Sequence, residues 1–119
     1  MSNDLRFLLI DDHEDTIQYI KEIIKAAYPS KIMFAKSGNE AIQFIKDGIE
    51  FDIIISDYQM PDGDGLHVFN YLQSLPSPIP FILHTSSIIL PKFIGKNFLG
   101  VVEKGDWNTI IKLIKALED

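Results

Sequence analysis

The stretch of sequence that decides the fold runs from Phe7 to Asp12 and reads Phe-Leu-Leu-Ile-Asp-Asp. Four consecutive apolar residues followed by charge are typical of a short strand that is covered on both faces of a parallel sheet. Four further short apolar runs, rich in β-branched and aromatic residues, have the same character. They are residues 32–35, 53–55, 81–83 and 101–102. We therefore expect five buried parallel strands.

Between these runs, the apolar residues change to the spacing of an amphipathic helix. The helical stripes are Ile17, Ile20, Ile24 and Ala27; Ala41, Ile42 and Ile45; Leu66, Phe69 and Leu72; and Ile110, Ile111, Ile114 and Leu117. Ser37 and Glu40 have the spacing of a capping box, and Gly48 is placed to end that helix. Five strand-then-helix units predict a doubly wound α/β fold with helices on both faces of the sheet. Between the fourth and fifth strands, Pro91 limits any helix to a short one.

Composition narrows the possible classes of protein. The 119 residues, 46% apolar and 24% charged, fit one globular domain. The absence of cysteine excludes disulfides and thiolate metal sites. The net charge of −6 argues against nucleic acid or an anionic membrane as the main partner. Two aspartates come before any secretory signal core could form, and no apolar run approaches the ~18 residues of a membrane span, so we expect an intracellular protein.

Polar residues stand where the expected strands stop. They are Asp11 and Asp12, Asp57, Thr85 and Ser86, and Lys104. The carboxyl ends of parallel strands open on one edge of the sheet, and ligands bind at that edge in folds of this class. We therefore expect these side chains to converge on one site.

Three carboxylates gathered at one edge repel one another. Two unit charges about 4 Å apart interact by ~4 kcal/mol at an effective dielectric of about 20, so either some of the carboxyls protonate or a cation joins them. Oxygen ligands without cysteine or paired histidines favour a hard ion such as Mg²⁺. A carboxylate beside Mg²⁺ and a lysine can attack phosphorus and form an aspartyl phosphate. Lys104 and Thr85 are then placed to neutralise and orient the phosphoryl oxygens.

Five features of the sequence occur in order and at near-standard spacing. They are the run from Phe7 to Asp12, Ser-Asp-Tyr-Gln-Met-Pro at residues 56–61, Asp64-Gly65, Thr85 and Lys104. Together they resemble the receiver domain of two-component response regulators, over essentially the whole chain. The resemblance implies a flavodoxin-like three-layer sandwich with five parallel strands in the order 2-1-3-4-5. Because Asp119 directly follows the last expected helix, we expect a single receiver domain over residues 1–119 with no attached output domain.

The resemblance further implies roles for individual residues. Asp57 is expected to be the phosphoacceptor. Asp12, Asp57 and the backbone carbonyl of Gln59 are expected to hold Mg²⁺, for which Mn²⁺ is a possible substitute, and Asp11 is expected to help through a water molecule. The strand-end residues Thr85 and Lys104 are expected to contact the phosphoryl group.

The sequence departs from the family pattern in three places. Val101 stands where the family commonly has an aromatic residue whose rotamer follows activation, and it is too small and too stiff to replace that side chain. Gly105 stands where the family usually has a proline in a cis bond. A non-proline cis bond costs ~2.5–4 kcal/mol, so we predict a trans Lys104–Gly105 bond. The stretch from Thr85 to Lys104 is also shorter than usual, and we expect phosphorylation to be signalled by a reordering of residues 86–100.

These features predict a cytoplasmic signalling protein that is not a classical enzyme. Its only expected reactions are its own phosphorylation and slow dephosphorylation. The expected phosphodonor is a histidine kinase or a histidine phosphotransfer protein. The expected downstream protein binds residues 86–100 and the last helix, and neither nucleic acid nor membrane is expected as a partner.

Other functions are compatible with a similar architecture. The chain could be a receiver-like docking module that acts without phosphorylation. An aspartate-nucleophile phosphatase usually needs Asp-x-Asp and a cap over the site, whereas Asp11 and Asp12 are adjacent. A nucleotide- or flavin-binding module is disfavoured because no glycine-rich phosphate loop occurs. Outside the site, His84 is expected to point away from Thr85 into a packed environment, by strand alternation, and His13 to lie on the surface.

Overall fold

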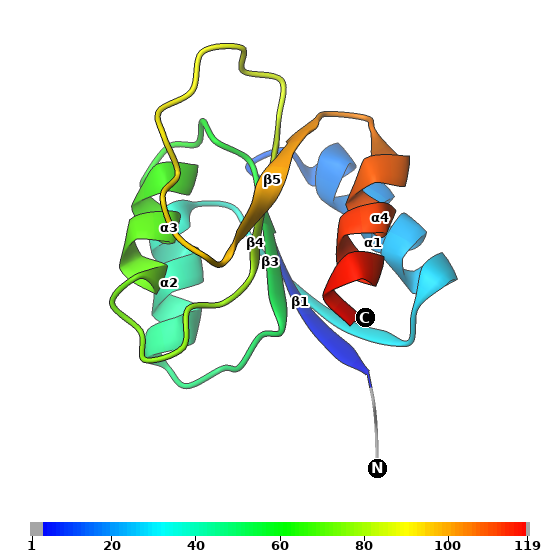
Figure 1. Ribbon diagram of the computed structural model, residues 1–119, viewed down its shortest axis with the longest axis horizontal. Helices are drawn as coiled ribbons and strands as arrows, with labels where there is room; N and C mark the ends of the chain where they lie inside the picture. Colours follow the sequence, from blue (N-terminus) through cyan, green and yellow to red (C-terminus); the bar gives the residue numbers. More distant parts are fainter. Residues whose placement is uncertain (1–3, 119) are drawn as a thin grey trace.

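The computed structural model describes residues 4–118, which form five strands and four helices (Figure 1). The strands are β1 (Leu5–Ile10), β2 (Ser30–Ala35), β3 (Ile53–Ser56), β4 (Phe81–Thr85) and β5 (Phe98–Glu103). The helices are α1 (Glu14–Ala27), α2 (Gly38–Lys46), α3 (Gly65–Leu72) and α4 (Trp107–Glu118). None of these helices within residues 4–118 is long and apolar enough to cross a membrane.

All five strands are parallel, and neighbouring strands hydrogen-bond in the order β2-β1-β3-β4-β5. The expected strand order and the flavodoxin-like receiver fold are therefore confirmed. Ile10 at the end of β1 pairs with Ala35 of β2 and with Ser56 of β3. Because these three strands stop at the same level, the residues that follow them emerge together at one edge of the sheet.

The helices cover the sheet in pairs, with α1 and α4 on one face and α2 and α3 on the other (Figure 1). Along β1, Phe7 and Leu9 pack on the α1 and α4 side, while Leu8 and Ile10 pack on the α2 and α3 side. Burying one such side chain contributes about 1.5–3 kcal/mol relative to leaving it exposed. The continuous apolar run is thus explained by burial on both faces.

One expected unit is missing, so the prediction of five strand-then-helix units is wrong in one place. Residues 86–97, which follow β4, form a loop without a helix, and the loop projects past the carboxyl edge of the sheet (Figure 1). Pro91 lacks the N–H that a helix interior needs. The loop is held instead by aromatic packing: Phe93 stacks on Phe98 with ring centroids 5.2 Å apart and forms a T-shaped pair with Phe69 at 5.3 Å.

Helix α2 has the ends that the sequence predicts. The hydroxyl of Ser37 accepts the N–H of Glu40 at 3.1 Å, and the Glu40 carboxylate accepts the N–H of Lys36 at 3.1 Å. The return bond therefore reaches one residue further back than in the usual capping box. After the helix, Gly48 takes a φ of +91°, and the N–H of Ile49 donates to the Phe44 carbonyl, as in a glycine-terminated helix.

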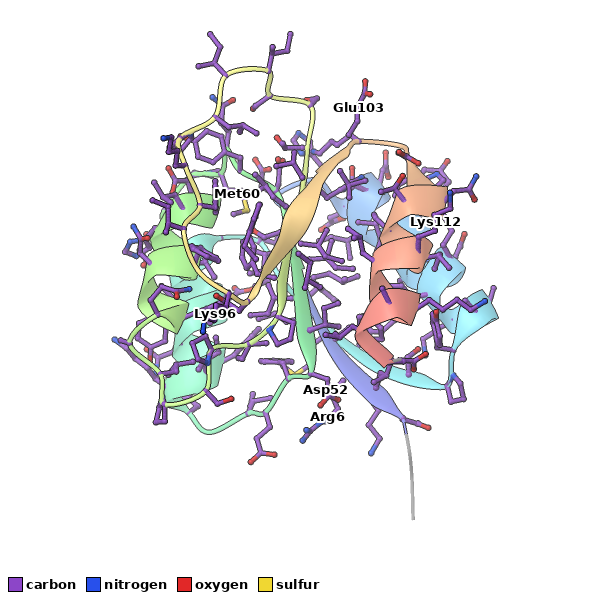
Figure 2. All side chains as sticks on the ribbon, viewed as in Figure 1. Arg6, Asp52, Met60, Lys96, Glu103 and Lys112 are labelled. Carbon is purple, nitrogen blue, oxygen red and sulfur yellow. The ribbon has the colours of Figure 1, made fainter. Side chains whose placement is uncertain are left out.

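An ion pair links the start of β1 to the residue before β3 at the amino edge of the sheet. The Arg6 guanidinium donates to the two carboxylate oxygens of Asp52 at 3.2 and 3.0 Å. Figure 2 shows this pair at the end of the sheet opposite Glu103. The hydrogen bond from Arg6 lowers the pKa of Asp52 below its ordinary value, although partial burial opposes the shift. The pair fixes the start of β1 against the segment that enters β3.

Candidate functional site

Backbone hydrogen bonds continue the sheet past the strand ends and place the polar residues of the carboxyl edge. The N–H of Asp57 donates to the Ile10 carbonyl at 2.8 Å, and the N–H of Lys104 donates to the Thr85 carbonyl at 3.1 Å. The N–H of Asp11 similarly donates to β2. Each of these residues therefore leaves the sheet in a fixed register with its neighbour, and Asp11, Asp57 and Lys104 come together as expected.

Asp57 is buried, and its carboxylate is held from two sides. Its Oδ1 accepts the N–H of Tyr58 at 2.7 Å, and its Oδ2 lies 2.9 Å from Nζ of Lys104. Gly65 approaches from behind: a Cβ at this position would lie 2.5 Å from the Asp57 carbonyl oxygen. That separation is too short for any side chain, so the Asp64-Gly65 motif has a packing reason at the site.

The ammonium of Lys104 is shared between two carboxylates. Nζ lies 2.9 Å from Oδ2 of Asp57 and 3.3 Å from Oδ2 of Asp11. Burial alone would lower the pKa of Lys104. The hydrogen bond to Asp57 and the charges of Asp11 and Asp57 outweigh burial, so the pKa lies above its ordinary value. Lys104 is therefore a cation at neutral pH and offsets part of the carboxylate repulsion.

His13 also belongs to the site, which the sequence reasoning missed. Its Nδ1 lies 3.0 Å from Oδ1 of Asp11 and 3.2 Å from Oδ1 of Asp12, and its backbone N–H donates to Oδ1 of Asp11 at 2.9 Å. The ring is largely exposed, so the surface placement is confirmed, but the ring turns back onto the carboxylates. The only signal in the sequence is its position directly after the two aspartates, where it is the N-cap of α1.

The acidic group fits a hard cation. Asp11, Asp12, His13 and Asp57 each offer a ligand atom, and these atoms lie within 4.8 Å of one another. Within residues 4–118, the buried Oδ2 of Asp11 and Oδ1 of Asp12 accept no hydrogen bond of good geometry, and each makes an ion-pair contact instead, to Nζ of Lys104 at 3.3 Å and to Nδ1 of His13 at 3.2 Å. Such carboxylate oxygens are the ligands that Mg²⁺ and Mn²⁺ prefer. Gln59 follows in the loop after β3, and the role of its carbonyl as a ligand stays a prediction.

Strand β4 ends in two residues with opposite orientations. The Thr85 hydroxyl is buried and accepts the N–H of Ser87 at 3.1 Å, which leaves its own proton able to be donated. The His84 ring is buried 5.3 Å from the Trp107 ring, which confirms the packing role expected for it. The same ring accepts the N–H of Gly105 at 3.3 Å, a contact that strand alternation does not predict. Contact of Thr85 with a phosphoryl group stays a prediction.

Val101 and Gly105, the two departures from the family pattern nearest to Lys104, lie on β5 and in the turn after it. Val101 is 51% exposed on β5. No peptide bond within residues 4–118 is cis, so the trans geometry predicted for Lys104–Gly105 is confirmed. Gly105 has a φ of +93°, in the left-handed region that favours glycine.

The loop after Asp57 is anchored to the start of α2 by contacts that the sequence reasoning did not identify. The N–H of Gly38 donates to the Gly63 carbonyl at 2.9 Å, and the N–H of Asn39 donates to the Asp62 carbonyl at 3.0 Å. The Asn39 amide also donates to the Asp62 carboxylate at 2.8 Å. The acidic side of the site is thereby tied to a regular helix.

Comparison with known proteins places this geometry in context. Residues 7–114 match the response regulator receiver domain family. The signal receiver domain of an HD domain-containing protein from Pseudomonas fluorescens Pf-5 superposes with a TM-score of 0.85 at 23% identity, with 98% of this chain and 95% of that chain covered. A CheY-like response regulator receiver domain from Methylobacillus flagellatus gives a TM-score of 0.78 at 19% identity, with 97% and 99% covered. At this level of identity, the two structures show a shared fold.

Proposed function

This chain belongs to the response regulator receiver domain family of two-component signalling, and we propose that Asp57 is its phosphoacceptor. The observation that carries the proposal is the environment of the Asp57 carboxylate. It is buried at the carboxyl edge of the sheet, lies 2.9 Å from the Lys104 ammonium and shares a cluster with Asp11 and Asp12. Such a carboxylate is a nucleophile with a cation already in place for the incoming charge.

In the proposed reaction, one carboxylate oxygen of Asp57 attacks the phosphorus of a phosphohistidine. An O–P bond forms as the P–N bond breaks, and the departing imidazole takes up a proton. Lys104 is close enough to neutralise a phosphoryl oxygen, and the unused hydroxyl proton of Thr85 can be donated to another. The Asp57 backbone is bonded to β1 before the donor arrives, so the attack by its carboxylate needs little reorganisation.

The proposal includes a divalent cation at the acidic cluster. Asp12, Asp57 and the Gln59 carbonyl would hold Mg²⁺ or Mn²⁺, with Asp11 assisting through water. The bound ion supplies charge neutralisation at the phosphoryl oxygens. The close grouping of ligand atoms from Asp11, Asp12 and Asp57, within 4.8 Å of one another, supports this assignment.

The proposed partners are proteins on either side of a phosphorelay in the cytoplasm. The donor is a histidine kinase or a histidine phosphotransfer protein. The downstream partner binds residues 86–100 and α4. Ile88 and Ile89 in this segment are 96% and 90% exposed, which supports a protein-binding role for it.

The test is incubation with acetyl phosphate and Mg²⁺, followed by intact mass measurement. We expect one phosphoryl group on the wild-type chain, and none on Asp57→Asn or after chelation of the cation. Asp47→Asn, an exposed aspartate at the end of α2, is the matched control and should react as the wild type does. A folded wild-type chain that takes up no phosphoryl group would favour the docking module. Rapid release of phosphate over many turnovers would favour the phosphatase.

A further inference from the structure

The turn between β5 and α4, which carries Lys104, contacts a buried histidine of β4. His84 is 1% exposed, and its Nε2 lies 3.3 Å from the backbone nitrogen of Gly105. Its ring packs against Trp107, the first residue of α4, with centroids 5.3 Å apart. The ring therefore contacts the turn directly after Lys104 and the helix that follows.

The contact determines which ring nitrogen carries the proton. The Gly105 N–H is a donor, so Nε2 must be the unprotonated acceptor. Burial, together with the positive charge of Lys104, lowers the pKa of His84, so the ring is neutral at neutral pH. A neutral ring with a bare Nε2 carries its proton on Nδ1, which is buried without a hydrogen-bond partner within residues 4–118. Rotating the ring away from the turn would therefore leave both ring nitrogens unsatisfied, which favours the orientation that keeps the bond from Gly105.

Gly105 is suited to this contact in two ways. Its trans bond and its φ of +93° turn the chain sharply after Lys104. It also retains an N–H, which a proline at this position would lack. No neighbouring atom lies within 4 Å of where a Cβ would be, so this glycine is required by the backbone angle and not by crowding.

We propose that His84 is a positioning residue for Lys104: its Nε2 fixes the turn at Gly105, and the fixed turn directs the ammonium onto Asp57. The Lys104 N–H bond to Thr85 holds the turn on one side, and the Gly105 N–H bond to His84 holds it on the other. The effect on phosphoryl transfer rests on the function proposed above for Asp57 and Lys104.

Two variants separate the acceptor from the packing. His84→Phe keeps a ring against Trp107 but has no acceptor, whereas His84→Gln places an amide oxygen that can accept the same N–H. We expect His84→Phe to speed hydrogen exchange of the Gly105 amide about tenfold, as loss of one hydrogen bond implies, while amides of β1 and β3 exchange at unchanged rates. Uptake of a phosphoryl group from acetyl phosphate should slow by a similar factor, and His84→Gln should recover most of both losses. Equal behaviour of the two variants would overturn the proposal.

A measurement on the wild-type chain keeps the proposal testable if the variants fail to fold. Nitrogen-15 NMR of the His84 ring should show the proton on Nδ1, and a proton on Nε2 would contradict the proposal. Ring tautomer and Gly105 exchange need no phosphodonor. If both behave as expected and the chain takes up no phosphoryl group, then the proposed function fails and the positioning of the turn stands. Phosphoryl uptake at an unchanged rate in His84→Phe would overturn the positioning role alone.

Discussion

The two halves of the site are held with different firmness. The acidic half consists of Asp11, Asp12 and Asp57, which follow β1 and β3. These are interior strands packed on both faces, and the loop after Asp57 is hydrogen-bonded to the start of α2. The other half consists of Thr85 and Lys104, which are expected to contact the phosphoryl oxygens and lie where β4 and β5 end. There, residues 86–97 form a loop in place of a helix, and β5 lies at the edge of the sheet.

This difference between the two halves matches two physical requirements of a phosphorylation switch. Nucleophilic attack requires carboxylates that stay in place before the donor arrives. Signalling requires an element with two arrangements of similar free energy, and such elements come from the less stable parts of a structure. The acidic half keeps the family's sequence pattern, whereas both departures near Lys104, Val101 and Gly105, fall in the other half.

The largest expected effect is on stability, and it distinguishes a phenylalanine of helix α3 from one in the loop at residues 86–97. Phe69 of α3 is fully buried, so Phe69→Ala should lower the free energy of unfolding by about 3–5 kcal/mol. Phe93 in the loop is only partly buried, and Phe93→Ala should cost much less and speed amide exchange mainly in residues 86–97. Denaturant titration and hydrogen exchange measure both. Equal losses of stability would show that the loop is held as firmly as the helix.

The next effect concerns the acidic half alone. Asp12→Ala should weaken Mg²⁺ binding by at least about 10- to 100-fold, because it removes a proposed ligand and the loss of an outer-shell partner alone costs that much at a metal site. It should also raise the thermal midpoint without metal, because a carboxylate is removed from a group that repels itself. Calorimetric titration and thermal melts give the two values. Asp15→Ala, in the first turn of α1, is the control, and equal Mg²⁺ affinity of Asp12→Ala and the control would remove Asp12 from the cation site.

The response to activation should be confined to the other half. Beryllofluoride mimics an acyl phosphate, and its binding with Mg²⁺ should change amide exchange in residues 86–100, around Ile89, Phe93 and Phe98. A ligand shifts such an element only by its differential affinity for the two arrangements. The amides of β1 and β3 should change little. Unchanged exchange in this segment, together with a clear change elsewhere, would contradict the expected route of the signal.

The smallest effect is a pH dependence of stability. Folding lowers the pKa of His84 below its ordinary value of 6.5, so the unfolded chain binds a proton that the folded chain does not. The stabilisation that the neutral ring contributes is therefore fully present above pH 6.5. As the pH falls below 6.5, His84 lowers the free energy of unfolding by at most about 1.4 kcal/mol per pH unit. His84→Phe should flatten this part of the profile relative to the wild type. A slope in His84→Phe identical to that of the wild type would exclude His84 as the source.

Much of the fold follows from local sequence. The run from Phe7 to Ile10 is apolar on both faces and therefore becomes an interior strand, and Ser37 and Gly48 mark the ends of α2 because capping is a local interaction. The convergence of Asp57 and Lys104 follows from the rule that parallel strands end at one edge.

Other features depend on contacts between distant residues and on ring orientation. The loop at residues 86–97 is held by Phe93 against aromatic rings of α3 and β5 instead of by helical hydrogen bonds. The turn of His13 onto the carboxylates and the bond from Gly105 to His84 depend on side-chain direction, which hydrophobic spacing does not encode. These features lie mostly in the half of the site that departs from the family pattern.

The most direct test of the central claim is to locate the phosphoryl group on the chain. Borohydride reduction of an acyl phosphate leaves homoserine in place of aspartate, and peptide mass spectrometry then identifies the residue. After treatment with acetyl phosphate and Mg²⁺, we predict homoserine at position 57 alone, and none when Mg²⁺ is omitted. Homoserine at position 11 or 12, or a phosphoryl group on a histidine with Asp57 intact, would contradict the account.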